Sequence, residues 1–181
     1  VYDRENEEYL IFWASTTGRD NFEKQRIWAV TTKDFETFSE PFIYIEKPTT
    51  IIDTTIVYDQ GKYYRFTKDE RDKAITMEVG DTIRGTWTEV EDFTLKTMTG
   101  YEGPACYQLR PSAEGEEGDW CLLLDNYARG RGYIPYVTKD LASGNFVEGE
   151  SFDFPFRLRH GSVLTLSEEE FQRVQAAFDR S

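Results

Sequence analysis

The sequence is poor in the residues that most metal and nucleophile chemistries require. Its 181 residues include one histidine, His160, and two cysteines, Cys106 and Cys121. A single histidine excludes a multi-histidine zinc site and an H-E-x-x-H pair. The chain also lacks a P-loop, a G-x-G-x-x-G turn and a G-x-S-x-G elbow, which excludes the phosphate-binding and serine-hydrolase sites that these motifs build. We therefore expect any chemistry in this chain to use carboxylates.

Basic residues and long apolar runs are also scarce. Lysine and arginine number 21 against 34 acidic residues, which gives a net charge of −13. Nucleic acid and anionic membrane surfaces are therefore poor partners, and we predict neither. No apolar run approaches membrane-spanning length, and no segment resembles a signal peptide, so the sequence indicates no particular compartment. The length fits one domain with a real core, residues 1–181.

The two cysteines do not form a metal motif. They lie on neighbouring candidate strands, so a cross-strand disulfide is open, although two buried free thiols are favoured.

Short strand patterns separated by polar turns fill residues 1–165, with no helical periodicity there. Three hairpins resemble one another, at residues 1–13, 57–66 and 106–124. A third strand and a turn follow each hairpin, at residues 27–38, 75–87 and 134–146. Each of these segments carries an aspartate ahead of its turn and then an aromatic that can open a fourth strand. The aspartates are Asp34, Asp81 and Asp140, and the aromatics are Phe38, Trp87 and Phe146.

Such four-stranded units repeat at intervals of 47 and 59 residues, measured between the aspartates. Antiparallel units of this length are typical of β-propeller blades. A generic β-sandwich also alternates strands and turns, but the repeated aspartate turn favours the propeller.

The tail departs from the repeat. Residues 160–166 predict one more strand, and residues 167–178 predict a helix whose capping box is formed by Ser167 and Glu170. Phe171, Val174 and Phe178 share one face of that helix, so we expect this face to pack against the body of the protein.

Two carboxylates occupy the same place in the repeat. Asp53 lies five residues before Tyr58, and Glu102 lies five residues before Tyr107. In a propeller the first strand of each blade is innermost, so its leading residue points into the central channel. His160 opens the last candidate innermost strand in the same way. We predict that all three converge on one cavity, although taken singly each acid could be an exposed loop residue.

Four stretches together resemble glycoside hydrolase family 43: IIDTTIVYDQGKYYRF, EGPACYQL, DNYARGRGYIPYVTKDL and RHGSVLTLSEEEF. The similarity runs over essentially the whole chain. The resemblance implies an all-β, five-bladed β-propeller that hydrolyses arabinofuranosides and xylosides with inversion. On this reading the chain holds about three and a half blades and a short C-terminal helix.

The resemblance also implies roles for individual residues. Glu102 matches the general acid, and Asp53 matches the aspartate that tunes the pKa of that acid and orients it. His160 matches a histidine near the channel centre that is often associated with a metal such as calcium, directly or through water; no cofactor is required. Arg159 is placed to face the sugar, and Tyr101 is an aromatic that could stack on a sugar ring.

The sequence departs from the family pattern at its beginning. The family's general base is an aspartate of the first blade, whereas this chain is expected to begin inside the second, and Asp3 falls at a turn position. We therefore expect the base upstream of Val1, an inactive isolated piece, and open blade edges that favour self-association or a missing N-terminal segment.

A non-catalytic carbohydrate-binding propeller or an inactive remnant remains the alternative. A purely structural interaction domain would give no reason for the shared register of Asp53 and Glu102.

Overall fold

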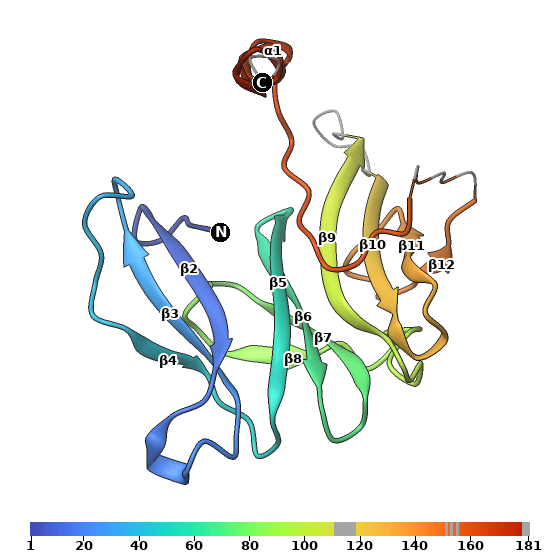
Figure 1. Cartoon of the computed structure of the whole chain (residues 1–181). Coiled ribbons are helices and arrows are strands. Elements are labelled where there is room, and N and C mark those ends of the chain that lie inside the picture. The colour runs from blue at the N-terminus through green and yellow to red at the C-terminus, as the bar shows by residue number, and fades with distance from the viewer. Residues whose placement is uncertain (111–118, 151, 153, 155, 179–181) are drawn as a thin grey trace.

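The computed structural model describes residues 1–110, 119–150, 152, 154 and 156–178. It contains three four-stranded antiparallel sheets arranged side by side (Figure 1). Blade 1 comprises β1 (Tyr2–Asp3), β2 (Glu8–Ser15), β3 (Arg26–Thr32) and β4 (Phe42–Ile45). Blade 2 comprises β5 (Ile51–Asp59), β6 (Lys62–Asp69), β7 (Ala74–Gly80) and β8 (Trp87–Glu89). Blade 3 comprises β9 (Glu102–Arg110), β10 (Asp119–Asn126), β11 (Gly132–Thr138) and β12 (Val147–Glu148). Strands consecutive in sequence are neighbours in every sheet, which confirms the predicted blades.

Apolar layers between the blades hold them together. The layer between blades 2 and 3 includes Phe66, Phe93, Leu122 and Phe146, all fully or nearly fully buried. Burial of such side chains contributes roughly 1.5–3 kcal/mol each. A smaller layer around Leu10 joins blade 1 to blade 2. These layers fix the relative positions of β5 and β9, the strands that carry the predicted carboxylates.

The repeated aspartate turn is built differently in the three blades. Asp34 accepts hydrogen bonds from the backbone N–H groups of Thr37 and Glu36, which lower its pKa to about 2. Asp140 caps its turn by accepting from Ala142 N–H. Asp81 instead forms an ion pair with Lys62 at 2.6 Å. The fourth strand of blade 1 begins at Phe42 and not at the exposed Phe38.

The strand predicted at residues 160–166 is absent from the structure, which assigns no regular element there. An isolated strand leaves its backbone N–H and C=O groups without partners, so a strand persists only where a neighbour completes the hydrogen-bond ladder. No described strand pairs with this segment. The half blade expected from the sequence is therefore not formed as a strand.

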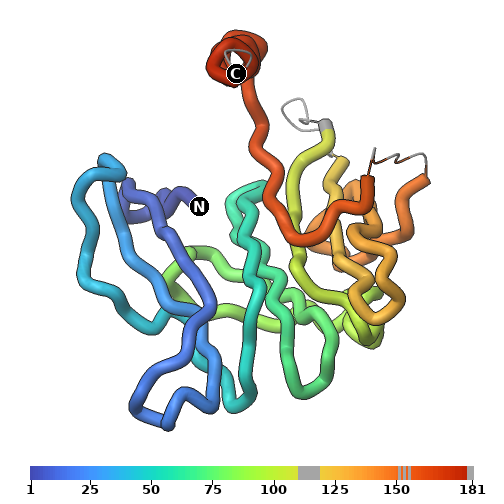
Figure 2. The backbone as a smooth tube through the Cα atoms, in the orientation of Figure 1, coloured from blue at the N-terminus to red at the C-terminus, as the bar shows by residue number. Residues whose placement is uncertain are grey.

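The helix α1 (Glu168–Phe178) forms as predicted, but it does not pack as predicted. Ser167 and Glu170 make both hydrogen bonds of the capping box. Phe171, Val174 and Phe178 are exposed, the last by 76%, and α1 buries no residue. Figure 2 shows that the backbone after blade 3 rises away from the sheets before it enters α1. None of the helices among the described residues is long and apolar enough to cross a membrane.

The cysteines are not bonded to each other. Cys106 on β9 lies opposite Leu122, next to Cys121 on β10. Burial raises the pKa of the Cys106 thiol and raises that of Cys121 to about 11. Both are therefore poorly reactive thiols. They are free, as the sequence favoured, although Cys106 is only partly buried.

Candidate active site

Asp53 lies at an irregularity near the start of β5. The register of β5 against β6 shifts between Ile52 and Thr55, as in a β-bulge. Asp53 itself has φ 49°, a left-handed conformation that is uncommon outside glycine. Bulges re-aim side chains next to functional sites, and strained residues of this kind persist where the surroundings fix them. Here the fixing contact is the Gly103 N–H, which donates to Asp53 Oδ2 at 3.1 Å.

Glu102 opens β9, where a second irregularity occurs. The pairing of β9 with β10 shifts between Leu123 and Asp125, and Asp125 lies opposite Glu102. The following Gly103 has φ 58°, and a Cβ atom there would lie 2.6 Å from the ring of His160. Glycine is therefore required both by the backbone conformation and by the close approach of the histidine.

His160 and Arg159 come from a segment that crosses the end of blade 3. Leu158 O accepts a hydrogen bond from Tyr133 N–H at 2.9 Å, and Arg157 donates to Gly130 O at 3.0 Å. The segment lies so close to β11 that a Cβ atom on Gly132 would meet Leu158 O at 2.3 Å. Residues 157–161 are thus attached to blade 3 by one backbone hydrogen bond, one side-chain hydrogen bond and close packing, without forming a strand.

The buried Tyr133 hydroxyl joins this segment to β9. It accepts a hydrogen bond from Gly161 N–H at 2.8 Å and lies 2.9 Å from Gly103 O and 3.1 Å from Gly161 O. Burial raises the pKa of Tyr133, so the hydroxyl keeps its proton and can donate it to either carbonyl. Glu102 and His160, the neighbours of these two glycines, are held together by this hydroxyl.

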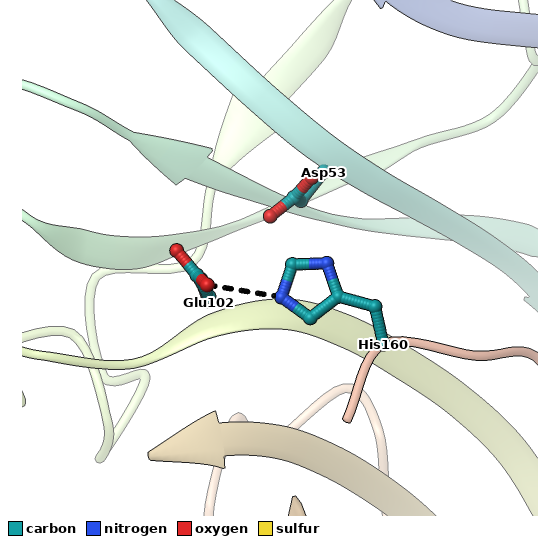
Figure 3. A group of neighbouring side chains, drawn as sticks. All are labelled: Asp53, Glu102 and His160. Carbon is teal, nitrogen blue, oxygen red and sulfur yellow. Dashed lines mark hydrogen bonds and ion pairs between the residues drawn. The ribbon is translucent and has the colours of Figure 1, made fainter. Parts of the chain in front are cut away.

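The three side chains predicted to converge do so. One ligand atom of Asp53, one of Glu102 and one of His160 all lie within 4.8 Å of one another. Figure 3 shows the two carboxylates and the imidazole pointing toward a common point from β5, β9 and the crossing segment. Glu102 Oε1 lies 3.1 Å from His160 Nε2 and 3.1 Å from Arg159 Nη2. Arg159 therefore contacts the same carboxylate as His160, and binding of the sugar by Arg159 stays a prediction.

A pocket of about 170 Å³ opens beside these groups, lined by Asp53, Gly103, Tyr133, His160 and neighbouring residues. Ligand-binding pockets usually have volumes of ~300–1,000 Å³. The described residues therefore form one wall of a site, not a complete enclosure.

Tyr101 is placed differently from the other predicted site residues. Its ring packs against the layer between blades 2 and 3, with its centroid 6.2 Å from that of Tyr136. Its hydroxyl accepts a hydrogen bond from Tyr136 at 3.3 Å. It is half-buried, and stacking on a sugar stays a prediction for this residue.

Lys68 on β6 was missed by the sequence reasoning. It is fully buried, and its Nζ donates to Tyr101 O at 2.7 Å. Burial lowers the pKa of Lys68, while the negative charges of Glu70, Glu102 and Asp53 act in the opposite direction. A buried cation of this kind fixes the carbonyl immediately before Glu102. A lysine that closes an apolar-aromatic strand, as in KYYRFTK, was the available signal.

Asp125 on β10 was also missed. It is fully buried; its Oδ2 accepts from Arg159 Nε at 2.7 Å and lies 3.5 Å from His160 Nε2. The hydrogen bond and charge of Asp125 raise the pKa of Arg159 above its ordinary value. The signal was a carboxylate at the end of the apolar run WCLLL, at the same end of the hairpin as Glu102.

The predicted metal was compared with this donor set. Calcium takes six to eight oxygen ligands, whereas the site offers two carboxylates and one imidazole. Gly103 N–H already donates to Asp53 Oδ2, and the Arg159 guanidinium lies 3.1 Å from Glu102, where it would repel a dication. These residues do not fit direct calcium coordination, and a metal held through water stays a prediction.

Tyr133→Phe tests how the site is held together. Loss of the hydroxyl leaves Gly161 N–H without its partner, so we expect a stability loss of about 1–3 kcal/mol. We also expect a shifted NMR signal from His160, the one histidine of this stretch, assigned with His160→Gln. Tyr63→Phe is the matched control, because the Tyr63 hydroxyl joins Arg4 N–H and Tyr2 O in blade 1 in the same manner. In Tyr63→Phe we expect a similar stability loss and an unchanged His160 signal. An unchanged His160 signal in Tyr133→Phe would contradict the proposed role of the Tyr133 hydroxyl.

Comparison with known proteins shows the family of this chain. The family model described as "Probable glycosyl hydrolase domain", related to glycoside hydrolase family 43, matches residues 1–172. An α-L-arabinofuranosidase of Bifidobacterium longum subsp. longum is 23% identical over 201 aligned positions, which cover 84% of this chain and 19% of that protein.

Solved structures share the fold. An exo-β-1,3-galactanase from Phanerochaete chrysosporium, solved with β-1,3-galactotriose, matches with a TM-score of 0.58 and 14% identity, over 82% of this chain and 34% of that one. A β-1,3-galactosidase of glycoside hydrolase family 43 matches with a TM-score of 0.57 and 17% identity, over 84% of this chain and 31% of the other. The chain thus spans about a fifth to a third of the length of these relatives. Since the family model covers nearly all of its residues, the chain belongs to this glycosyl hydrolase domain family of the family 43 type.

Proposed function

We propose that this chain supplies the acid-bearing part of a glycoside hydrolase site, with Glu102 as the general acid. The observation that carries the proposal is the convergence of Asp53, Glu102 and His160 within 4.8 Å, beside a pocket that Asp53 and His160 line. Among the described residues, Glu102 makes its hydrogen bonds through Oε1. Its Oε2 is left to carry a proton to the departing glycosidic oxygen.

Asp53 is proposed to tune and orient Glu102. An inverting pair of acid and base keeps its carboxyl groups about 6.5–9.5 Å apart to admit a water molecule. A carboxylate oxygen of Asp53 lies within 4.8 Å of one of Glu102, too close for that role, and Oδ2 is held by Gly103. We assign the base to a carboxylate outside this chain's residues, as the resemblance implies.

Inversion is part of the proposal and needs its own test. A spacing of about 5–5.5 Å is typical of retaining glycosidases, in which the second carboxylate is a nucleophile. The proton NMR spectrum of the first-formed product should show the anomer inverted relative to the substrate. A retained anomer would make Asp53 the nucleophile and overturn its proposed role.

The proposed substrates are arabinose- or xylose-containing glycosides of plant origin. The similarity to an arabinofuranosidase supports arabinose. Galactosides are a second candidate, because the galactanase and galactosidase structures share the fold. The alternative from another class is a carbohydrate-binding propeller that does not hydrolyse its ligand.

A substrate screen tests the proposed function. The whole protein that contains this chain is incubated with aryl α-L-arabinofuranosides, β-D-xylosides and β-D-galactosides and with the corresponding oligosaccharides. We expect release of the sugar from one class, and loss of activity on the oligosaccharide in Glu102→Gln. Binding of an oligosaccharide without hydrolysis would support the binding propeller and refute the hydrolase.

A further inference from the structure

The buried carboxylate of Asp125 is not explained by the fold. The side chain is 0% exposed, and Oδ1 has no hydrogen-bond partner among the described residues. An unsatisfied buried oxygen costs about 1–3 kcal/mol. The backbone of Asp125 pairs with Tyr133 and Glu102 as any residue could, so the sheet does not require an acid here.

The carboxylate contacts two side chains of the crossing segment, Arg159 and, at 3.5 Å, His160. The contact with Arg159 is the shorter. The guanidinium spans two acids, with Nε 2.7 Å from Asp125 Oδ2 and Nη2 3.1 Å from Glu102 Oε1. The Arg159 side chain is 55% exposed and projects from a segment without regular structure. A long side chain in such a position loses much rotational freedom when it is held in one orientation.

The two acids hold Arg159 unequally. Glu102 is partly exposed, whereas Asp125 is buried, and a charge-assisted hydrogen bond to a buried partner is less weakened by solvent. The shorter contact is also the one to Asp125. Glu102 must be free to exchange a proton in the proposed reaction, so it is the poorer anchor of the two.

We infer that Asp125 is a positioning residue, whose buried carboxylate holds Arg159 so that the guanidinium stays beside Glu102, where it can bind the sugar. The sugar-binding part of this inference rests on the proposed function. The holding of Arg159 by Asp125 rests on the geometry alone, and the two parts are tested separately.

The holding is tested by NMR of the arginine Nε–H groups in the ¹⁵N-labelled whole protein. We expect the Arg159 Nε–H, assigned with Arg159→Lys, to exchange with water at least about tenfold faster in Asp125→Ala, with a smaller effect in Asp125→Asn. The internal controls are Arg26 Nε, 2.8 Å from Glu46, and Arg65 Nε, 3.0 Å from Glu78. The exchange rates of their N–H groups should not change. An unchanged exchange rate for Arg159 in Asp125→Ala overturns the inference, whatever the activity of the protein.

Thermal unfolding separates positioning from a structural role. Asp125→Asn should change the melting temperature little, because removal of a buried charge offsets loss of the ion pair with Arg159, while the amide leaves a buried polar atom without a partner as the carboxylate does. A clear drop in melting temperature together with loss of the Arg26 and Arg65 signals would mean that Asp125 supports the fold, and would overturn the inference.

The kinetic test is a double-mutant cycle with the glycoside that the whole protein hydrolyses. Asp125→Asn should reduce kcat/KM by about 10²-fold, as misplacement of a substrate-positioning group can, and should add little to Arg159→Lys. Losses that multiply would show that Asp125 does not act through Arg159, and overturn the inference. If no glycoside is hydrolysed, the proposed function fails and the NMR result alone decides the role of Asp125.

Discussion

Glu102→Gln is expected to slow hydrolysis of natural glycosides by the whole protein by about 10²–10⁴-fold, the usual contribution of general acid catalysis. Glutamine keeps the size of the side chain and can still accept from Arg159 and His160. It cannot deliver a proton to the leaving oxygen. Dinitrophenyl glycosides have a good leaving group that needs little protonation, so their hydrolysis should slow much less.

The comparison of the two substrate types is measured as kcat/KM for each. Glu89→Gln on β8 is the matched control, since it removes an exposed acid of the same kind from blade 2 and should leave both rates unchanged. If Glu102→Gln lowers kcat/KM equally for both substrate types, this residue positions the sugar and does not donate the proton.

Gly132→Ala is expected to destabilise the chain and to displace residues 157–161. The residue has φ 79°, where alanine costs roughly 1–2 kcal/mol. The new methyl group would also lie 2.3 Å from Leu158 O, and overpacking of this kind typically costs a further 1–3 kcal/mol, or about 2–5 kcal/mol together. For a domain of about 150–250 residues, a loss of that size lowers the melting temperature by roughly 4–20 °C.

Gly61→Ala separates the two causes. Gly61 has φ 83° in the turn between β5 and β6, and nothing lies within 4 Å of the added Cβ. Gly61→Ala should therefore reduce stability only by the ~1–2 kcal/mol that backbone strain costs. The His160 NMR signal should move in Gly132→Ala and not in Gly61→Ala. Equal stability losses and an unmoved His160 signal would show that the contact with Leu158 does not hold the segment.

The blades could be predicted from the sequence because each is made of strands consecutive in the chain. Short-range signals sufficed: an apolar run, a polar turn and a second run, as in VYDQGKYYRF. The innermost position of Asp53 and Glu102 followed from the same repeat. Their convergence with His160 needed only that the blades lie side by side.

The tail could not be predicted in the same way. Whether residues 160–166 form a strand depends on a second strand that pairs with them, not on their own pattern. No described strand does so. The apolar face of α1 indicated burial, but a face of this kind does not say what covers it.

The long-range contacts of the buried Asp125 and Lys68 side chains were likewise beyond the sequence. Asp125 precedes Arg159 by 34 positions and Lys68 precedes Tyr101 by 33, so no local pattern joins them. The contacts depend on where a loop crosses a sheet. A carboxylate at the end of an apolar strand was a sufficient signal for Glu102 and could have been applied to Asp125.

The crossing of residues 157–161 over blade 3 has a consequence for biosynthesis. Each blade pairs strands that leave the ribosome in order, so the three sheets can form as the chain emerges. Arg159 and His160 are made after all twelve strands. The two acids on β5 and β9 are therefore made before Arg159 and His160, and the site can be completed only after the three blades have been made.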